Sequence, residues 1–238
     1  MSIYTEKTVR DLAVAVPGAT RVFEEMGIDY CCGGSKPLPE ACSKAGIPLQ
    51  DITEALDRAK ARYAKDAPAD WQSSSLTELA AYIVEKHHVY TQNEISRLEP
   101  LSAKVASVHA ERHPELIRVQ GLVHSLGSDL KSHMLKEEQV LFPRIHQLEE
   151  AAQSSEALPD GYLDFIRMPV QCMMQEHDAA GEILKELREV SDGYAVPADG
   201  CISYKTLYQA IQELERDLHQ HIHLENNILF PRALALGK

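Results

Sequence analysis

Two stretches of the chain carry the same grouping of ionisable side chains inside an apolar run. His133 and Glu137 lie four residues apart, and His221 and Glu225 repeat that spacing in the second half of the chain. Residues four apart on a helix point to one side, so each pair can offer a nitrogen and an oxygen to neighbouring metal ions. A single pair of this kind is usually a hydrogen-bonded surface pair, so it is the repetition of the pair that indicates a metal site.

Helical phase predicts that both pairs are buried. At 100° per residue, each His and each Glu falls within an apolar stripe. The stripes are defined by Leu126, Leu130 and Leu141 in one stretch and by Leu214, Leu218 and Leu229 in the other. Glu138 and His223 turn away from these stripes, so we expect them to be solvated. A buried carboxylate costs several kcal/mol unless it is paired, and neither stripe holds a Lys or Arg at that level. The two glutamates therefore require a cation.

Two further stretches each add one histidine to the same interior. His87 follows the stripe of Leu76, Leu79 and Ile83, whereas the adjacent His88 leaves that stripe. His177 lies in a stripe with Ile166, Val170, Met173, Ala180 and Leu184. The chain thus has two matched halves, each giving one His and then one His-x-x-x-Glu. Together they predict six inward ligands: His87, His133, His177, His221, Glu137 and Glu225.

This ligand set favours two metal ions over one. Six ligands exceed what one zinc site uses, and the absence of Cys from the stripes disfavours structural zinc and iron–sulfur ligation. Two ions bridged by Glu137 and Glu225, with two histidines each, use every ligand and leave room for a bridging oxo or hydroxo group. Mixed imidazole and carboxylate ligation suits iron, with manganese or zinc as possible substitutes.

The elements that must position these ligands are helices. Apolar residues recur at three- and four-residue spacing over 76–98, 114–150, 162–190 and 203–229, and strand-like alternation is scarce. We therefore predict an all-α fold, an up-and-down four-helix bundle preceded by a small helical module. The stretch DAPADWQSSS interrupts the periodicity, so the predicted domains are 1–66, a linker at 67–75, and the bundle at 76–238. We interpret the L-F-P-R segments after each glutamate as packing, with a proline that ends or kinks the helix.

Composition limits the partners and the location. The net charge is −12, with 36 acidic and 24 basic residues, which argues against a nucleic-acid or anionic-membrane partner. The apolar run near the N-terminus is too short for a secretory signal, and no run approaches a membrane span. The five cysteines do not form the even pattern of a secreted disulfide framework. A cytoplasmic protein with reduced thiols is expected, and a homodimer is left open.

The vicinal cysteines Cys31 and Cys32 lie in the stretch DYCCGG, between a tyrosine and two glycines. A disulfide between adjacent cysteines closes a strained ring, so two accessible thiols on an exposed turn are the expected state. Such a pair suits thiol chemistry: accepting a nitrosyl group, resolving an oxidised neighbour, or passing a metal ion to or from the bundle. The alternative is that both are small residues packed in a tight turn. Cys42, Cys172 and Cys201 show no partner spacing.

These features together resemble a known family. The repeated His and Glu pattern, with DYCCGG at 29–34 in a short helical module, is similar to the repair of iron centres family, the hemerythrin-like di-iron proteins also called ScdA or YtfE. The resemblance covers nearly the whole chain. It implies a non-haem di-iron centre whose ligands map onto His87, His133, Glu137, His177, His221 and Glu225.

The resemblance also implies a function, with alternatives. It implies a protein that helps to repair iron–sulfur clusters after oxidative or nitrosative stress, by supplying iron to damaged iron–sulfur proteins. The alternatives are a di-iron nitric oxide reductase, or a sensor or carrier that binds nitric oxide or oxygen. A simple carrier of oxygen or nitric oxide is disfavoured, because the oxygen carrier hemerythrin has one more histidine than this bundle supplies.

Overall fold

The computed structural model describes residues 4–63, 71–154, 162 and 164–236, and their regular structure is helical. The β-bridge recorded within these residues is isolated and joins Thr8 to Pro37. The prediction of an all-α fold is therefore confirmed. No helix in the described ranges has both the length and the apolar character needed to cross a lipid bilayer.

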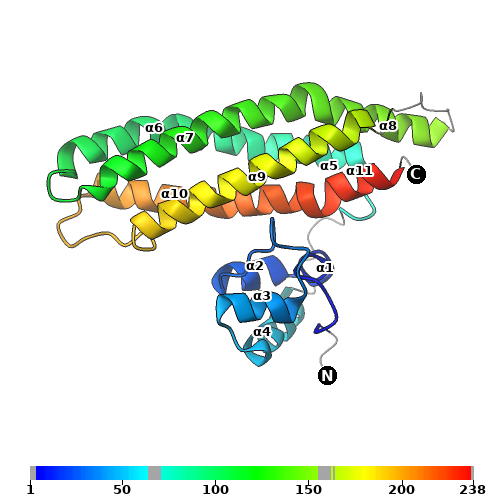
Figure 1. The fold of residues 1–238 in the computed structure, drawn as a ribbon, viewed down its shortest axis with the longest axis horizontal. Coiled ribbons are helices and arrows are strands. Elements are labelled where there is room, and N and C mark those ends of the chain that lie inside the picture. Colours follow the sequence, from blue (N-terminus) through cyan, green and yellow to red (C-terminus); the bar gives the residue numbers. More distant parts are fainter. Residues whose placement is uncertain (1–3, 64–70, 155–161, 163, 237–238) are drawn as a thin grey trace.

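Four long helical rods run alongside one another and form an up-and-down bundle (Figure 1). Each rod is a continuous helical stretch, and three of them contain a short π-helical turn. The first rod is α5 (Leu76–Ile83), η1 (Val84–His88) and α6 (Val89–His109), and the second is α7 (Glu115–Lys136), η2 (Glu137–Leu141) and α8 (Phe142–Ser154). The third is α9 (Asp164–Val190), and the fourth is α10 (Ile202–Leu224), η3 (Glu225–Leu229) and α11 (Phe230–Leu236). The predicted four-helix bundle is confirmed.

The three π turns shift the helical phase within their rods. A π turn inserts about one extra residue, so side chains after it are displaced by about 100° from an unbroken α-helix. Two of these turns are closely followed by a proline, Pro143 or Pro231, and the helix continues through both. A proline cannot donate to the preceding turn and crowds the carbonyl four residues before it. A widened turn at that point accommodates both defects, so neither proline ends its rod.

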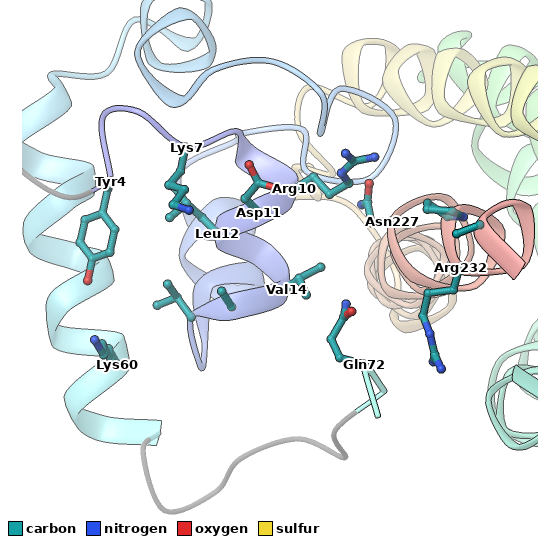
Figure 2. A pocket seen from close by; sticks show the side chains of 14 residues that line it. Tyr4, Lys7, Arg10, Asp11, Leu12, Val14, Lys60, Gln72, Asn227 and Arg232 are labelled. Atoms are coloured by element: carbon teal, nitrogen blue, oxygen red, sulfur yellow. The ribbon is translucent and has the colours of Figure 1, made fainter. Parts of the chain in front are cut away.

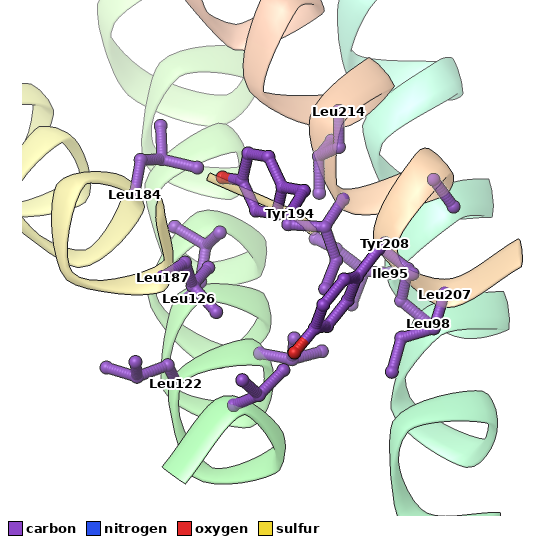
Figure 3. Close-up of a cluster of buried hydrophobic side chains, with 14 of the residues drawn as sticks. Ile95, Leu98, Leu122, Leu126, Leu184, Leu187, Tyr194, Leu207, Tyr208 and Leu214 are labelled. Carbon is purple, nitrogen blue, oxygen red and sulfur yellow. The ribbon is translucent and has the colours of Figure 1, made fainter. Parts of the chain in front are cut away.

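The bundle has two apolar clusters, one toward each end. The first, shown in part in Figure 3, joins α6, α7, α9 and α10 around residues such as Leu126, Leu184 and Tyr208. The second joins α5, α8, α9 and the last rod around residues such as Ile145 and Phe230. In each rod, the buried His and Glu side chains lie where the residues of one cluster end and those of the other begin. A polar layer therefore separates two apolar cores.

The N-terminal module has its own core. It consists of α1 (Val9–Ala15), α2 (Ala19–Glu25), α3 (Leu38–Ala45) and α4 (Leu49–Tyr63). Its apolar cluster draws only on residues up to Tyr63. Figure 1 shows the module beside the fourth rod, with the loop between α2 and α3 reaching α10. The boundaries 1–66, 67–75 and 76–238 stay a prediction, since residues 64–70 lie outside the described part of the chain.

Candidate metal centre

Six buried side chains from all four rods converge between the two apolar clusters. Two groups of four residues can each bring their ligand atoms within 4.8 Å of one another, and both groups contain Glu137 and Glu225. His88 and His221 complete one group, and His133 and His177 complete the other. The six side chains are at most 3% exposed. The geometry therefore supplies two adjacent four-ligand sets that share both carboxylates.

The distances within the cluster show how the carboxylates are shared. Nε2 of His133 lies 3.0 Å from Nε2 of His177, and Nε2 of His88 lies 3.2 Å from Nε2 of His221. Each glutamate contacts one histidine of each pair. For Glu137 these contacts are 3.3 Å to His133 and 3.4 Å to His88, and for Glu225 they are 3.1 Å to His177 and 3.0 Å to His221.

Five of the six predicted ligands belong to this cluster, and His87 does not. The structure brings His88 into the cluster instead, because π turn η1 at 84–88 adds a residue between Ile83 and the site. His87 packs beside the cluster: its Nδ1 lies 3.1 Å from Oδ1 of Asp217, and its ring stacks on His221 at 5.6 Å. The other two π turns begin at Glu137 and Glu225, so the residues before those turns keep α-helical phase.

Three of the four inward histidines are held from behind by an acceptor oxygen. Nδ1 of His88 lies 2.7 Å from Oε1 of Glu138, and Nδ1 of His133 lies 2.9 Å from Oε2 of Glu176. Nδ1 of His177 lies 2.9 Å from Oδ1 of Asn226. Because these oxygens accept hydrogen bonds, each Nδ1 carries the proton and donates it. Each Nε2 is then left facing the cluster, where its lone pair is available to a bound metal ion.

These acceptors were missed from sequence, and Glu138 was wrongly expected to be solvated. Glu138 is only partly exposed, and it bonds to a histidine on another rod. All three acceptors are chain neighbours of a cluster residue: Glu138 follows Glu137, Glu176 precedes His177 and Asn226 follows Glu225. One step along a helix turns a side chain by 100°, away from its own stripe and toward the next rod. The sequence feature that could have indicated these acceptors is a polar residue directly beside a predicted ligand.

The electrostatics of the cluster favour bound cations. Burial pushes the pKa of Glu225 upward, but His221 and His177 reverse this and hold it well below its ordinary value. For Glu137, burial and the charge of Glu225 raise the pKa, and His133 and His88 lower it further than that. Both Glu137 oxygens and Oε2 of Glu225 are buried and lack a well-oriented hydrogen bond within the described residues. Two ionised carboxylates with orphaned oxygens fit a binuclear cation site.

The nitrogen spacing also fits metal ions. Two nitrogens bound at right angles to one ion, each about 2.1 Å from it, lie about 3.0 Å apart. The two Nε2–Nε2 distances of 3.0 Å and 3.2 Å match this value. The donor set of imidazole nitrogen and carboxylate oxygen, without thiolate, is typical of non-haem iron.

Comparison with known proteins agrees with this geometry. Residues 79–233 match the hemerythrin HHE cation binding domain, and residues 5–60 match ScdA_N, a domain of unknown function. A probable iron-sulfur cluster repair protein of Haemophilus influenzae is 35% identical over 231 residues, 97% of this chain and 98% of the relative. The iron-sulfur cluster repair proteins YtfE of Pectobacterium atrosepticum and Escherichia coli are each 34% identical, over 97% and 98% of this chain and 98% of each relative. The chain belongs to this YtfE family.

The second conspicuous motif of this YtfE-family chain is the vicinal cysteine pair, and it is less exposed than expected. Cys31 is buried and Cys32 is half-buried, with their sulfurs 3.9 Å apart. Oδ1 of Asp29 accepts hydrogen bonds from the backbone N–H groups of both cysteines, which forms a tight turn. The hydrogen bond to Cys32 and burial raise the pKa of the Cys31 thiol well above its usual value. Of the two thiols, only Cys32 is partly open to solvent.

The cysteine turn docks directly behind the metal centre. Nδ2 of Asn226 donates to the carbonyl oxygen of Cys31 at 3.5 Å, and Oδ1 of the same side chain holds His177. The next residue, Asn227, donates to the carbonyl oxygen of Tyr30 at 2.9 Å. His223, which we expected to be solvated, is buried against the ring of Tyr30 at 5.4 Å. One asparagine therefore links the cysteine turn to a cluster histidine.

A separate hollow lies between the N-terminal module and the fourth rod (Figure 2). Its volume is about 660 Å³, and its lining includes α1 and the residues beside it, Lys60 and Gln72, and Asn227 and Arg232 of the fourth rod. Arg232 donates to the backbone carbonyls of Trp71 and Ser74, which ties the start of the bundle to α11. None of the six cluster side chains lines this hollow, so it is not the metal site.

Proposed function

We propose that this protein helps to repair damaged iron–sulfur clusters by donating iron from a di-iron centre. The observation that supports this most directly is that two four-ligand sets share Glu137 and Glu225 in a buried layer. The relatives that are similar over nearly the whole chain are named iron-sulfur cluster repair proteins. Damaged iron–sulfur proteins are accordingly the proposed partners.

In this proposal His88 and His221 hold one ion, His133 and His177 hold the other, and both glutamates bridge them. The bound ions supply a reservoir of exchangeable iron, and an oxo or hydroxo group is proposed as the further bridge. The protein's own part is to present the lone pairs of Nε2 and two carboxylates in a dry layer. Each set supplies four residues, which leaves positions for small exogenous ligands such as nitric oxide or oxygen.

The proposed role of Cys31 and Cys32 is to pass iron between the centre and a client. Support comes from their position, because the turn that carries them is hydrogen-bonded to Asn226, which also positions His177. Thiolates bind iron well and exchange it with other thiolates. Since Cys31 is buried and Cys32 is half-buried, Cys32 is the thiol that a client would meet first.

Reconstitution of an apo iron–sulfur enzyme tests this function. The client enzyme is supplied with sulfide and with either the iron-loaded or the iron-free protein, and its activity is followed over time. We expect recovery only with the iron-loaded protein, and we expect Glu137→Ala or Glu225→Ala to abolish iron loading and recovery together. Glu182→Ala, at an exposed position on α9, is the matched control and should behave as wild type.

Two outcomes would contradict iron donation. One is that iron-free protein restores the client as well as iron-loaded protein does. The other is sustained formation of nitrous oxide from nitric oxide with an electron donor, beyond one stoichiometric burst, without any transfer of iron to the client. That second result would favour the reductase over the donor.

A further inference from the structure

A cysteine and a histidine that the proposed function does not use meet at the end of the bundle remote from the metal centre. His109 is the last residue of α6, and Cys201 is the N-cap residue of α10. Nε2 of His109 lies 3.1 Å from Sγ of Cys201. The 21 residues of α6 separate this pair from His88, which at 1.5 Å per residue corresponds to about 30 Å along the helix.

The imidazole of His109 is held in place facing the thiol. The residue is only 5% exposed, and the edge of its ring packs against Tyr204 at 5.5 Å with an interplanar angle of 74°. Its other nitrogen, Nδ1, is buried and has no hydrogen-bond partner within the described residues. A buried imidazole normally finds a polar partner. Here the partner is the thiol, so the two side chains form a defined pair.

Cys201 is open to solvent, in contrast to His109. The cysteine lies at the start of a helix of 23 residues and makes no side-chain capping bond there. The N-terminal end of a helix favours a negative charge, and the C-terminal end favours a positive one. Transfer of the thiol proton to His109 would place a thiolate at the N-terminal end of α10 and an imidazolium at the C-terminal end of α6. Both helices therefore favour the transfer.

The acidic side chain closest in sequence to this cysteine is already neutralised. Asp199 lies 2.9 Å from Nε2 of His113 and 3.0 Å from Arg112. His113 in turn lies 3.4 Å from Glu115. Because the guanidinium of Arg112 offsets the charge of Asp199, that carboxylate does not oppose a thiolate at Cys201 as a free anion would.

We propose that Cys201 and His109 form a thiol–disulfide exchange site that reacts with small-molecule disulfides. Nε2 of His109 takes the thiol proton, and the sulfur of Cys201 attacks one sulfur of the disulfide. A new S–S bond forms to Cys201 as the S–S bond of the small molecule breaks, and the leaving thiolate takes the proton back from the imidazolium. Cys201 ends oxidised in a mixed disulfide, and one equivalent of small thiol is released.

The full-length protein contains its own reference thiol for the test. Cys172 is also exposed, but its sulfur lies 3.6 Å from a carboxylate oxygen of Glu176 and no histidine contacts it in the described structure. The protein is incubated with oxidised glutathione at pH 7, and adducts are counted peptide by peptide by mass spectrometry. Since a free thiol is only a few per cent thiolate at that pH, we expect Cys201 to react about tenfold faster than Cys172.

Two variants separate activation by His109 from simple exposure. His109→Gln should lower the rate at Cys201 to that of Cys172, because the amide cannot take the proton. His124→Gln, at an exposed position on α7, is the matched control and should leave both rates unchanged. Equal rates at Cys201 and Cys172 in the wild-type protein would overturn the proposal, and this comparison does not depend on whether a variant folds. An unchanged rate in a folded His109→Gln protein would overturn it as well.

Discussion

Nδ1 of His88 donates a hydrogen bond to Oε1 of Glu138 at 2.7 Å, across two neighbouring rods of the bundle. This bond fixes the ring so that Nε2 faces Glu137, whose carboxylate is fully buried. The adjacent His87 faces Asp217 instead. Two histidines adjacent in the chain therefore have different structural environments, and a direct comparison of the two can test the proposed ligand assignment.

Replacing His88 should impair iron binding, and replacing His87 should not. We expect His88→Ala to lose at least one of two irons per chain, because it removes a nitrogen from one of the two ligand sets. His87→Ala should keep both irons, since it removes only a ring that packs on His221. Iron analysis of the purified proteins and their optical spectra measure this. Loss of iron from His87→Ala but not from His88→Ala would identify His87 as the ligand instead.

Glu138 should tune iron affinity without binding iron itself. A carboxylate that holds a ligand histidine typically contributes 10- to 100-fold in metal affinity. We therefore expect Glu138→Ala to weaken iron binding by about that factor, measured by competition with a chelator, and Glu138→Gln to weaken it less because an acceptor oxygen remains. If Glu138→Ala binds iron as tightly as the control Glu182→Ala does, the hydrogen bond does not support the ligand.

Removing the metal should destabilise the bundle. Two buried carboxylates lose their strongest partners, and bound iron at a large excess over its dissociation constant contributes about 4 kcal/mol. For a chain of this size we expect the melting temperature to fall by about 10 °C. The double variant Glu137→Gln with Glu225→Gln should melt no lower than the ion-free wild type and should gain nothing from added iron. Stabilisation of that variant by iron would count against the assignment.

Glu149 should stabilise the start of the bundle in a pH-dependent way. Its carboxylate accepts hydrogen bonds from the backbone N–H groups of Leu76 at 2.6 Å and Thr77 at 2.9 Å, at the first turn of α5. Burial raises the pKa of Glu149, but the bonds from Thr77 and Leu76 lower it further, so its net pKa lies below the ordinary value. The stability from this group is thus present above the pKa of the unfolded chain and is lost as pH falls through the folded pKa.

Glu149→Gln should therefore cost about 1–3 kcal/mol of unfolding free energy at neutral pH. The difference from wild type should vanish in acid, once the carboxylate is protonated in both folded and unfolded chains. Urea unfolding at several pH values measures this. Glu150→Gln, the exposed neighbour, is the control and should change little. A pH-independent difference would show that packing, and not charge, explains the effect.

The sequence predicted the bundle and most of the cluster because both depend on helical periodicity. His133 and Glu137 follow Leu126 and Leu130 at regular α-helical spacing, and the π turn η2 begins only at Glu137. His88 lies at the last residue of η1, after the phase has shifted, so a constant 100° per residue selected His87 and not the histidine that joins the cluster. Nothing in a single sequence marks a π turn directly.

Helical periodicity also could not predict the contacts between the N-terminal module and the bundle. His223 faces away from the ligand stripe, as predicted, but the ring of Tyr30 covers it, and burial lowers its pKa to about 4. Cys31 is buried partly because Asn226 and Asn227 bind the backbone of its turn. Such burial arises from docking between segments nearly 200 residues apart, which a helical wheel cannot represent.

The π turns also determine how this protein can tolerate change. Because each inserted residue resets the rotation of its rod, the apolar clusters on either side of the metal layer need not share one continuous stripe. Deleting one residue within 84–87 would remove the π turn, and His88 would still face the cluster, because an unbroken α-helix brings the residue at the preceding position to that side. A relative that has lost one of these residues would therefore keep both the bundle and the paired ligand sets.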